Sequence, residues 1–413
     1  MKNRQTLLGL SLLAALVFFG AFILETKELY YRLLIGLGFG YALARASMGF
    51  AGSVNRLART GSSTLASALM LMFLLTSIVT AFFIYGTETS YALKIYPINM
   101  GLAVGGLMFG FGMTFSSCCA TGSLTDLSSG FSRAIVAVFF LSFGVFMGFN
   151  TQATTDFVRK SLITSPTGES FQGGVFLPDL FTFDGFHGYL GAIVLSAVFT
   201  FLLIYLARYY EKRYNAKHGF IPMEEVTQAF TRKELLFDIL FVRPWKMRVS
   251  VVIITLLFAS LLFLYEKGWS ASSAFGMWFG KLLMLFGVSA QFLSEFTHKS
   301  VEFFTTGLLS HGTTVQNGAI ILGAFFYLLI AGNFKNKFSA GLKISTKDFF
   351  VYAFGAFIMG FGTRLSNGCN VGALYTPIAE FSLSGWLYLV VVVIGGFAGN
   401  YVLKNYVNKT CAI

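Results

Sequence analysis

Charged residues are scarce in this chain: only 12% of its 413 residues are Asp, Glu, Lys or Arg, against an apolar fraction of 55%. A soluble chain of this length could not hide so much apolar surface in one core, so a water-soluble globular protein is excluded. Lipid must cover the apolar surface instead. The composition therefore predicts an all-α, polytopic membrane protein of about ten spans.

Cysteine and histidine are also few, with four of each. They are scattered, and neither the C-x-x-C nor the H-E-x-x-H spacing of common metal sites occurs. We therefore expect no metal, no cofactor and no enzymatic activity.

The net charge of +12 is one that a nucleic-acid-binding protein could carry. The basic residues concentrate between apolar runs, however, which favours the positive-inside bias of cytoplasmic loops, with lipid rather than nucleic acid as the partner. Nine Lys and Arg lie in 208–248, so we expect this segment to be cytoplasmic and the charge-balanced loop 151–187 to be extracytoplasmic.

Apolar stretches near 20 residues long predict eleven candidate spans. The run from Leu7 to Leu24 after Lys2 and Arg4 could be a signal peptide, but it is long and lacks a small-x-small cleavage site, so we interpret it as a retained span. The predicted spans are 6–24, 33–51, 64–85, 99–115, 133–150, 188–207, 249–265, 274–292, 317–331, 349–365 and 384–403.

The sequence matches itself at an offset of 250 residues. Gly110–Leu124 aligns without gaps on Gly360–Leu374, and nine of 22 positions from 103 to 124 are identical to their partners. This predicts a first membrane half-repeat at 1–150 and a second at 249–413. Residues 151–248 would then hold an extracytoplasmic loop, a connecting span and a basic cytoplasmic loop.

The two halves could run parallel or inverted. Residues 44–63 are basic whereas 293–314 are balanced, and 332–348 are basic whereas 86–98 are not. Opposite charge bias in equivalent loops is typical of inverted repeats. Inversion needs an odd number of crossings between equivalent spans, so we expect at least one of the eleven segments not to cross.

Each repeat motif follows an apolar run and then becomes small and polar, which predicts a short, broken helix at membrane depth. Such backbone is tolerated only where it is buried in protein or lines a cavity, and in inverted-repeat transporters two breaks form the substrate site. The alternative is Gly-mediated packing of helices, with cysteine as a small apolar residue. The candidate pathway residues are Ser116, Cys118, Cys119, Gly122, Arg364, Ser366, Asn367, Cys369 and Gly372.

The paired G-F-G-x-x-x-S-x-x-C-x-x-G-x-L segments, together with Arg45–Arg56, resemble the YeeE/YedE family of sulfur-transport membrane proteins, and the selenium-linked YedE branch most. The resemblance implies a channel-like importer of the bacterial inner membrane, with two related halves, short central helices and pathway thiols at Cys119 and Cys369. It also makes a cytoplasmic sulfur-carrier protein a candidate partner. Residues 45–56 lack the cysteine usual in the thiosulfate branch, which leaves thiosulfate, another sulfur species or a selenium species open as substrate.

Physical chemistry favours the same reading, because a neutral thiol is a soft, weak donor that can hold a soft sulfur or selenium atom and release it. Arg364 could attract an anion, or it could be a snorkelling or helix-capping residue. Cys118 faces Gly368 in the repeat and is a packing candidate. The competing functions are a transmembrane thiol–disulfide oxidoreductase, whose two cysteines would have to approach each other, and a purely structural membrane subunit.

Overall fold

A computed structural model describes the chain except for residues 1, 86–90, 219–236, 238–240 and 408–413. The described part is almost entirely helical, which confirms the predicted all-α class. An isolated antiparallel bridge joins Phe176 to Ser382. Arg232 and Lys233 of the predicted basic loop, and Cys411, lie outside the described residues.

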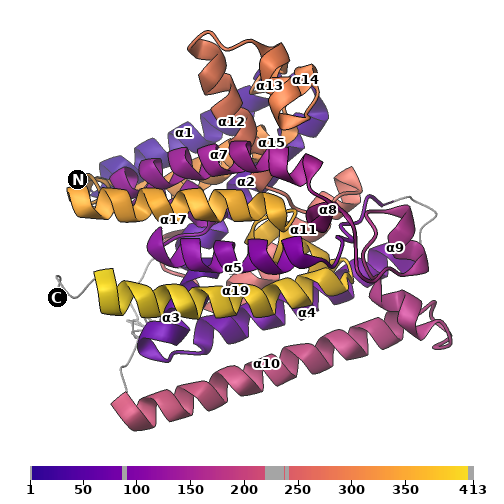
Figure 1. Ribbon diagram of the computed structural model, residues 1–413. Coiled ribbons are helices and arrows are strands. Elements are labelled where there is room, and N and C mark those ends of the chain that lie inside the picture. Colours follow the sequence, from indigo (N-terminus) through magenta and orange to yellow (C-terminus); the bar gives the residue numbers. More distant parts are fainter. Residues whose placement is uncertain (1, 86–90, 219–236, 238–240, 408–413) are drawn as a thin grey trace.

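The helices follow one another along the chain (Figure 1). The first part contains α1 (Lys2–Ile23), α2 (Lys27–Arg45), α3 (Phe50–Thr60), α4 (Thr64–Tyr85), α5 (Met100–Phe115), α6 (Ala120–Asp126) and α7 (Phe131–Thr154). The middle contains α8 (Asp156–Arg159), α9 (Pro166–Ser170), the 3₁₀ turn η1 (Leu177–Phe181) and α10 (Tyr189–His218). The last part contains α11 (Met247–Tyr265), α12 (Ser272–Leu285), α13 (Ala290–Thr297), α14 (Val301–Thr305), α15 (Gly312–Ile330), α16 (Phe334–Ala340), α17 (Thr346–Leu365), the π-helical turn η3 (Asn370–Tyr375), α18 (Thr376–Ala379), α19 (Leu383–Val402) and η4 (Leu403–Val407).

Ten helical stretches of the described chain are long and apolar enough to cross a membrane. The two outermost, α1 and α10, are only 11% and 22% buried over their most apolar windows, so lipid must cover them. α8 and α9 lie at one end of the bundle, whereas α1 begins and α19 ends at the opposite end (Figure 1). The chain is therefore a multi-pass membrane protein, as predicted.

The predicted span over 274–292 is wrong, because the helix breaks in its middle. α12 ends at Leu285, and Gly287 adopts a left-handed φ of 91° that costs little without a Cβ. The Val288 N–H then donates to the Leu283 carbonyl at 3.1 Å, as in a Schellman motif, and Ser289 caps the next helix, α13. The remaining 14-residue helix is too short to be a span.

Four helices, α7, α17, α5 and α19, pack in a row through the middle of the molecule (Figure 1). A methyl group added at Gly105 would lie 2.7 Å from the Gly362 carbonyl oxygen, and one at Gly362 would lie 2.7 Å from the Gly105 carbonyl oxygen. In the same reciprocal way, a methyl group added at Gly112 would lie 2.4 Å from the Gly355 carbonyl oxygen, and one added at Gly355 would lie 2.7 Å from the Gly112 carbonyl oxygen. The central helices α5 and α17 are thus antiparallel, and only glycine allows their backbones to approach so closely.

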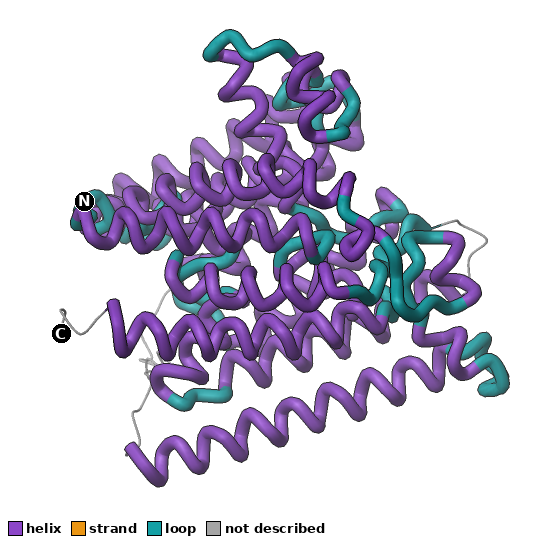
Figure 2. The backbone as a smooth tube through the Cα atoms, in the orientation of Figure 1, coloured by secondary structure: helices purple, strands orange, loops and turns teal. Residues whose placement is uncertain are grey.

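These contacts follow the sequence repeat. At the offset of 250 residues, Gly105 corresponds to Gly355 and Gly112 to Gly362, so each close pair maps onto the other. The outer helices of the row obey the same relation, because α7 packs on α17 as α19 packs on α5. Loop segments also interrupt the helices inside the bundle, not only at its ends (Figure 2).

Candidate functional site

The two repeat motifs form matching breaks after α5 and α17. The Ser116 hydroxyl donates to the carbonyls of Gly112 at 3.0 Å and Cys118 at 2.9 Å, and Ser366 does the same to Gly362 at 2.8 Å and Gly368 at 3.2 Å. These bonds fasten the end of each helix to the turn that follows it.

The next residue of each motif, Ser117 or Asn367, has a left-handed φ of 57° or 61°. This conformation is uncommon without glycine and turns the chain sharply. The side chain of Asn367 is also held, since its Oδ1 accepts a hydrogen bond from Gln152 Nε2 at 2.7 Å. The breaks predicted from the sequence are therefore present in the structure, and both have the same construction.

The cysteines Cys119 and Cys369 lie directly after the breaks, each immediately before a short helix. Their exposed fractions are 2% and 1%, and both are free thiols. The Cys119 sulfur accepts a hydrogen bond from the Gly122 N–H at 3.3 Å. The backbone N–H of Ala51, at the start of α3, is a second hydrogen-bond donor to this sulfur. The two thiols are close enough to interact electrostatically. The fold places both thiols, 250 residues apart in the sequence, in the same buried core.

The motif glycines Gly122 and Gly372 behave differently from the glycines on the long helices. A methyl group added at Gly372 would meet no atom within 4 Å, although the residue is buried. One added at Gly122 would meet only Cys118 and Cys119 of its own motif, at 3.5 Å. Close packing of long helices therefore explains glycines such as Gly105 and Gly112, but not these two: Gly372 borders open space, and Gly122 touches only its own motif.

Arg364 is buried with 6% exposure, so it does not snorkel to a membrane surface. Its guanidinium donates to Ser272 Oγ at 2.5 Å and to Thr363 Oγ1 at 3.3 Å, and it stacks 5.1 Å from the ring centre of Phe149. No ion pair to it is found within the described ranges. The arginine also interacts electrostatically with Cys369, so its positive charge is available beside the second thiol.

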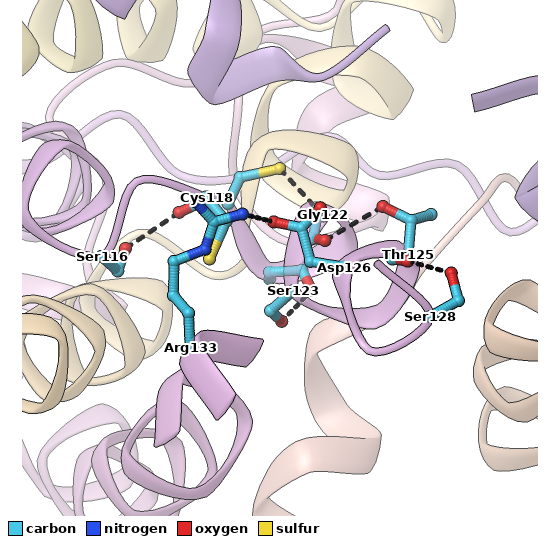
Figure 3. Close-up of polar contacts among 10 residues, drawn as sticks. Ser116, Cys118, Gly122, Ser123, Thr125, Asp126, Ser128 and Arg133 are labelled. Carbon is cyan, nitrogen blue, oxygen red and sulfur yellow. Dashed lines mark hydrogen bonds and ion pairs between the residues drawn. The ribbon is translucent and has the colours of Figure 1, made fainter. Parts of the chain in front are cut away.

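Cys118 is buried like its neighbour but has other surroundings (Figure 3). Its carbonyl accepts the Ser116 hydrogen bond, and its thiol interacts electrostatically with Asp126 and Arg133. Those two side chains form an ion pair of 2.5 Å at the end of α6 (Figure 3). These contacts suit the packing role expected from its place in the repeat.

A polar cavity of about 530 Å³ opens at the α9 end of the bundle. Three cationic residues, Arg32, Lys94 and Lys267, line it together with the imidazole of His311, and we call it the basic vestibule. Lys94 and a further lining residue, Tyr96, lie within the range of electrostatic interaction with Cys369, although Cys369 itself does not line the cavity. Sequence reasoning missed this site because its basic residues come from separate segments, and no local pattern connects them.

A buried carboxylate, Glu380, lies beside the vestibule. Its Oε2 accepts the Lys94 backbone N–H at 2.5 Å, and its Oε1 has no partner. The Lys94 ammonium donates to the Trp269 carbonyl at 2.6 Å. Burial raises the pKa of Glu380 to about 7 against the opposing effect of the Lys94 charge, and burial lowers the pKa of Lys94 to about 8.

The structure thus defines a class: a helical multi-pass membrane protein with two related broken segments, a pair of buried thiols and a basic vestibule. The model of a family described as sulphur transport matches residues 45–398, and the chain belongs to that family. The resemblance found in the sequence is therefore confirmed.

Relatives in this family carry transporter names. The chain is 30% identical to "Probable transporter YedE" of Escherichia coli (strain K12) over 164 residues, which are 38% of this chain and 39% of that protein. It is 21% identical to "Thiosulfate transporter TsuA" of the same organism over 376 residues, 90% and 93% of the two chains. It is 22% identical to TsuA of Spirochaeta thermophila over 312 residues, 74% and 79%. The YedE matches thus span less than half of those relatives, and the TsuA matches most of theirs.

Proposed function

We propose that this chain imports a small anion that carries a soft sulfur or selenium atom, with thiosulfate as the leading substrate. The observation that carries the proposal is the pair of matching breaks, in which the buried Cys119 and Cys369 each lie three residues before a glycine, and a Cβ added at Gly372 would meet nothing within 4 Å. The basic vestibule contains Lys94, which lies within electrostatic range of Cys369, and would concentrate anions on that side of the thiol. The thiosulfate transporters among the relatives support the choice of substrate.

The pathway runs from the basic vestibule past Arg364 and Cys369 to Cys119. A thiol is a weak, polarizable donor that contacts a sulfur or selenium atom without adding a like charge to the anion. Weak contacts in sequence suit conduction, because tight binding at one site would delay release. Arg364, without a carboxylate partner, lowers the electrostatic barrier for an anion entering the membrane. A cytoplasmic sulfur-carrier protein would accept the released sulfur species.

The halves 1–150 and 249–413 are inverted relative to each other in this proposal. The antiparallel packing of α5 on α17 and the reciprocal Gly105–Gly362 and Gly112–Gly355 contacts support this arrangement. Two equivalent antiparallel spans are related by a two-fold axis in the membrane plane, which would place both thiols near the middle of the bilayer. Omitting 274–292 leaves an odd number of crossings between the equivalent spans, which inversion requires.

We expect the α9 end of the bundle to be extracytoplasmic and 208–248 to be cytoplasmic, in a bacterial inner membrane. Single cysteines introduced at Thr167 and Lys217 test this orientation with an impermeant thiol reagent. Intact cells should label position 167 and leave position 217 unlabelled until they are permeabilised. The opposite pattern would reverse the direction of the pathway.

Uptake of ³⁵S-thiosulfate into cells or proteoliposomes containing the protein tests the function itself. Uptake should exceed that of membranes without the protein. Excess selenosulfate should compete more strongly than excess sulfate, which has the charge but not the soft atom. Uptake indistinguishable from the protein-free control would overturn the proposal for thiosulfate.

Uptake should weaken as the external pH rises from 6 to 7.5. Below pH 7 the Glu380 carboxyl is neutral and leaves the Lys94 charge unopposed, whereas above pH 7 the carboxylate cancels that charge for an arriving anion. The Michaelis constant for uptake should therefore rise several-fold over this range, since charge close to an entry site changes ligand capture. Glu380→Gln removes the carboxyl that titrates over this range, and with it the raising effect of its charge on the pKa of Lys94, so the profile should depart from that of the wild type. In Lys94→Gln the constant should stay high. An unaltered wild-type profile in Glu380→Gln would rule out this role of the carboxyl.

A further inference from the structure

The side chain of Tyr388 on α19 lies between the two halves and has no explained role. The residue is fully buried, with 0% exposure. Its ring packs against α5, at 6.2 Å between its centre and that of Phe109, and within 3.3 Å of a methyl group placed on Gly106. Its hydroxyl interacts electrostatically with both Cys369 and Cys119. The tyrosine is not repeated in the first half, because the residue 250 positions earlier is Val138.

No group among the described residues meets full hydrogen-bond geometry with the Tyr388 hydroxyl. The Ser366 hydroxyl lies close to it, but the Ser366 proton is directed at the carbonyls of Gly362 at 2.8 Å and Gly368 at 3.2 Å. A buried hydroxyl without a partner costs about 1–3 kcal/mol, and native proteins satisfy the large majority of such groups. A phenylalanine would fill the same space without this cost. The hydroxyl is therefore best explained by a partner that is present only during part of the protein's working cycle.

Other unpartnered polar atoms occur in the same two segments. The Thr121 hydroxyl, two residues after Cys119, and the Asn370 side-chain oxygen, directly after Cys369, are both buried without a partner. By contrast, the buried hydroxyl of Tyr375 on η3 is satisfied by Thr76 Oγ1 at 3.0 Å. Unmet hydrogen-bonding capacity thus recurs beside the thiols, while a neighbouring tyrosine has an ordinary structural bond.

We infer that the Tyr388 hydroxyl is an oxyanion-binding group that acts together with the thiols. The soft terminal atom of the passing anion contacts Cys369 or Cys119, and one of its oxygen atoms accepts a hydrogen bond from Tyr388. A phenol is a suitable donor here, because it is neutral and holds an oxyanion less tightly than a lysine would. The inference rests on the proposed function and narrows the substrate class to oxyanions that carry a terminal sulfur or selenium, rather than sulfide or selenide.

The substitution Tyr388→Phe tests this assignment, with Tyr375→Phe as the matched control. In Tyr388→Phe the Michaelis constant for ³⁵S-thiosulfate uptake should rise about tenfold, the effect of losing one hydrogen bond to a charged ligand. The melting temperature of the purified ligand-free protein should be unchanged or higher, since only an unsatisfied hydroxyl is removed. Stabilisation of the purified protein by added thiosulfate should become weaker. Tyr375→Phe should instead lower the ligand-free melting temperature and leave the Michaelis constant near its wild-type value.

An unchanged Michaelis constant in Tyr388→Phe would overturn the inference. A fall in the ligand-free melting temperature comparable to that of Tyr375→Phe would also overturn it, by revealing a structural role. Failure of the wild-type protein itself to take up thiosulfate would refute the proposed function first, and the role of Tyr388 with it. The wild-type measurement therefore separates the two failures.

Discussion

Uptake of thiosulfate falls to background in the Cys119→Ser, Cys369→Ser double variant, while the protein remains in the membrane at normal abundance: this is the largest effect that we expect. Serine is nearly the size of cysteine but is harder and less polarizable, so it serves a soft atom poorly. Each single substitution should lower uptake at least about tenfold, which corresponds to about 1.4 kcal/mol. Uptake and membrane abundance should be measured on the same preparations.

Cys118→Ser is the matched control for the thiol variants. Cys118 is equally free and buried, but its thiol interacts with the Asp126–Arg133 ion pair rather than with Cys369. Uptake should change little in this variant. Full uptake by the double variant would falsify the thiol pathway. Formation of a mixed disulfide by either pathway cysteine with a thiol partner, together with electron transfer, would favour the oxidoreductase alternative.

A bulky residue at Gly372 should block the pathway without unfolding the protein. Nothing lies within 4 Å of a Cβ at this position, and the residue does not have a positive φ, so its backbone accepts a side chain. Gly372→Leu should therefore abolish uptake while membrane abundance and melting temperature stay near the wild-type values. Gly372→Ala should leave partial uptake, because a methyl group only narrows the space.

Gly110→Ala is the contrasting control among the helix glycines. A methyl group there would lie 2.1 Å from the Val392 carbonyl oxygen of α19, and backbone at that distance cannot move aside cheaply. The membrane abundance and the melting temperature of this variant should fall, and uptake should fall only in proportion to the abundance. Loss of folded protein in Gly372→Leu similar to that in Gly110→Ala would show that Gly372 is a packing residue and not a border of the pathway.

Much of the candidate site could be predicted from local sequence, because each break is encoded within a few consecutive residues. Ser116 and Ser366 bond to carbonyls of their own segments, and the positive-φ turns at Ser117 and Asn367 follow directly. Such short-range geometry depends little on the rest of the fold. The false span over 274–292 also had a local sign: Gly287 followed by the capping residue Ser289.

Other features depend on residues far apart in the chain. The basic vestibule assembles Arg32, Lys94, Lys267 and His311, and Tyr388 on α19 lies within electrostatic range of both thiols. Composition and residue spacing do not predict which distant residues come together in the fold. Likewise, the sequence could not separate the glycines that pack helices from those that border open space.

The sequence by itself determined that lipid surrounds this protein, that it is helical, that it contains a repeat and that its two motif cysteines stand at equivalent breaks. These follow from composition and from hydrogen bonds between residues close in sequence, which depend little on the rest of the fold. Only the tertiary structure decided that α5 and α17 pack antiparallel, that Gly372 faces a space and that Arg364 has no carboxylate partner among the residues described. Those properties arise when distant segments pack together, since the surroundings of a side chain are set by neighbours that the local sequence does not name.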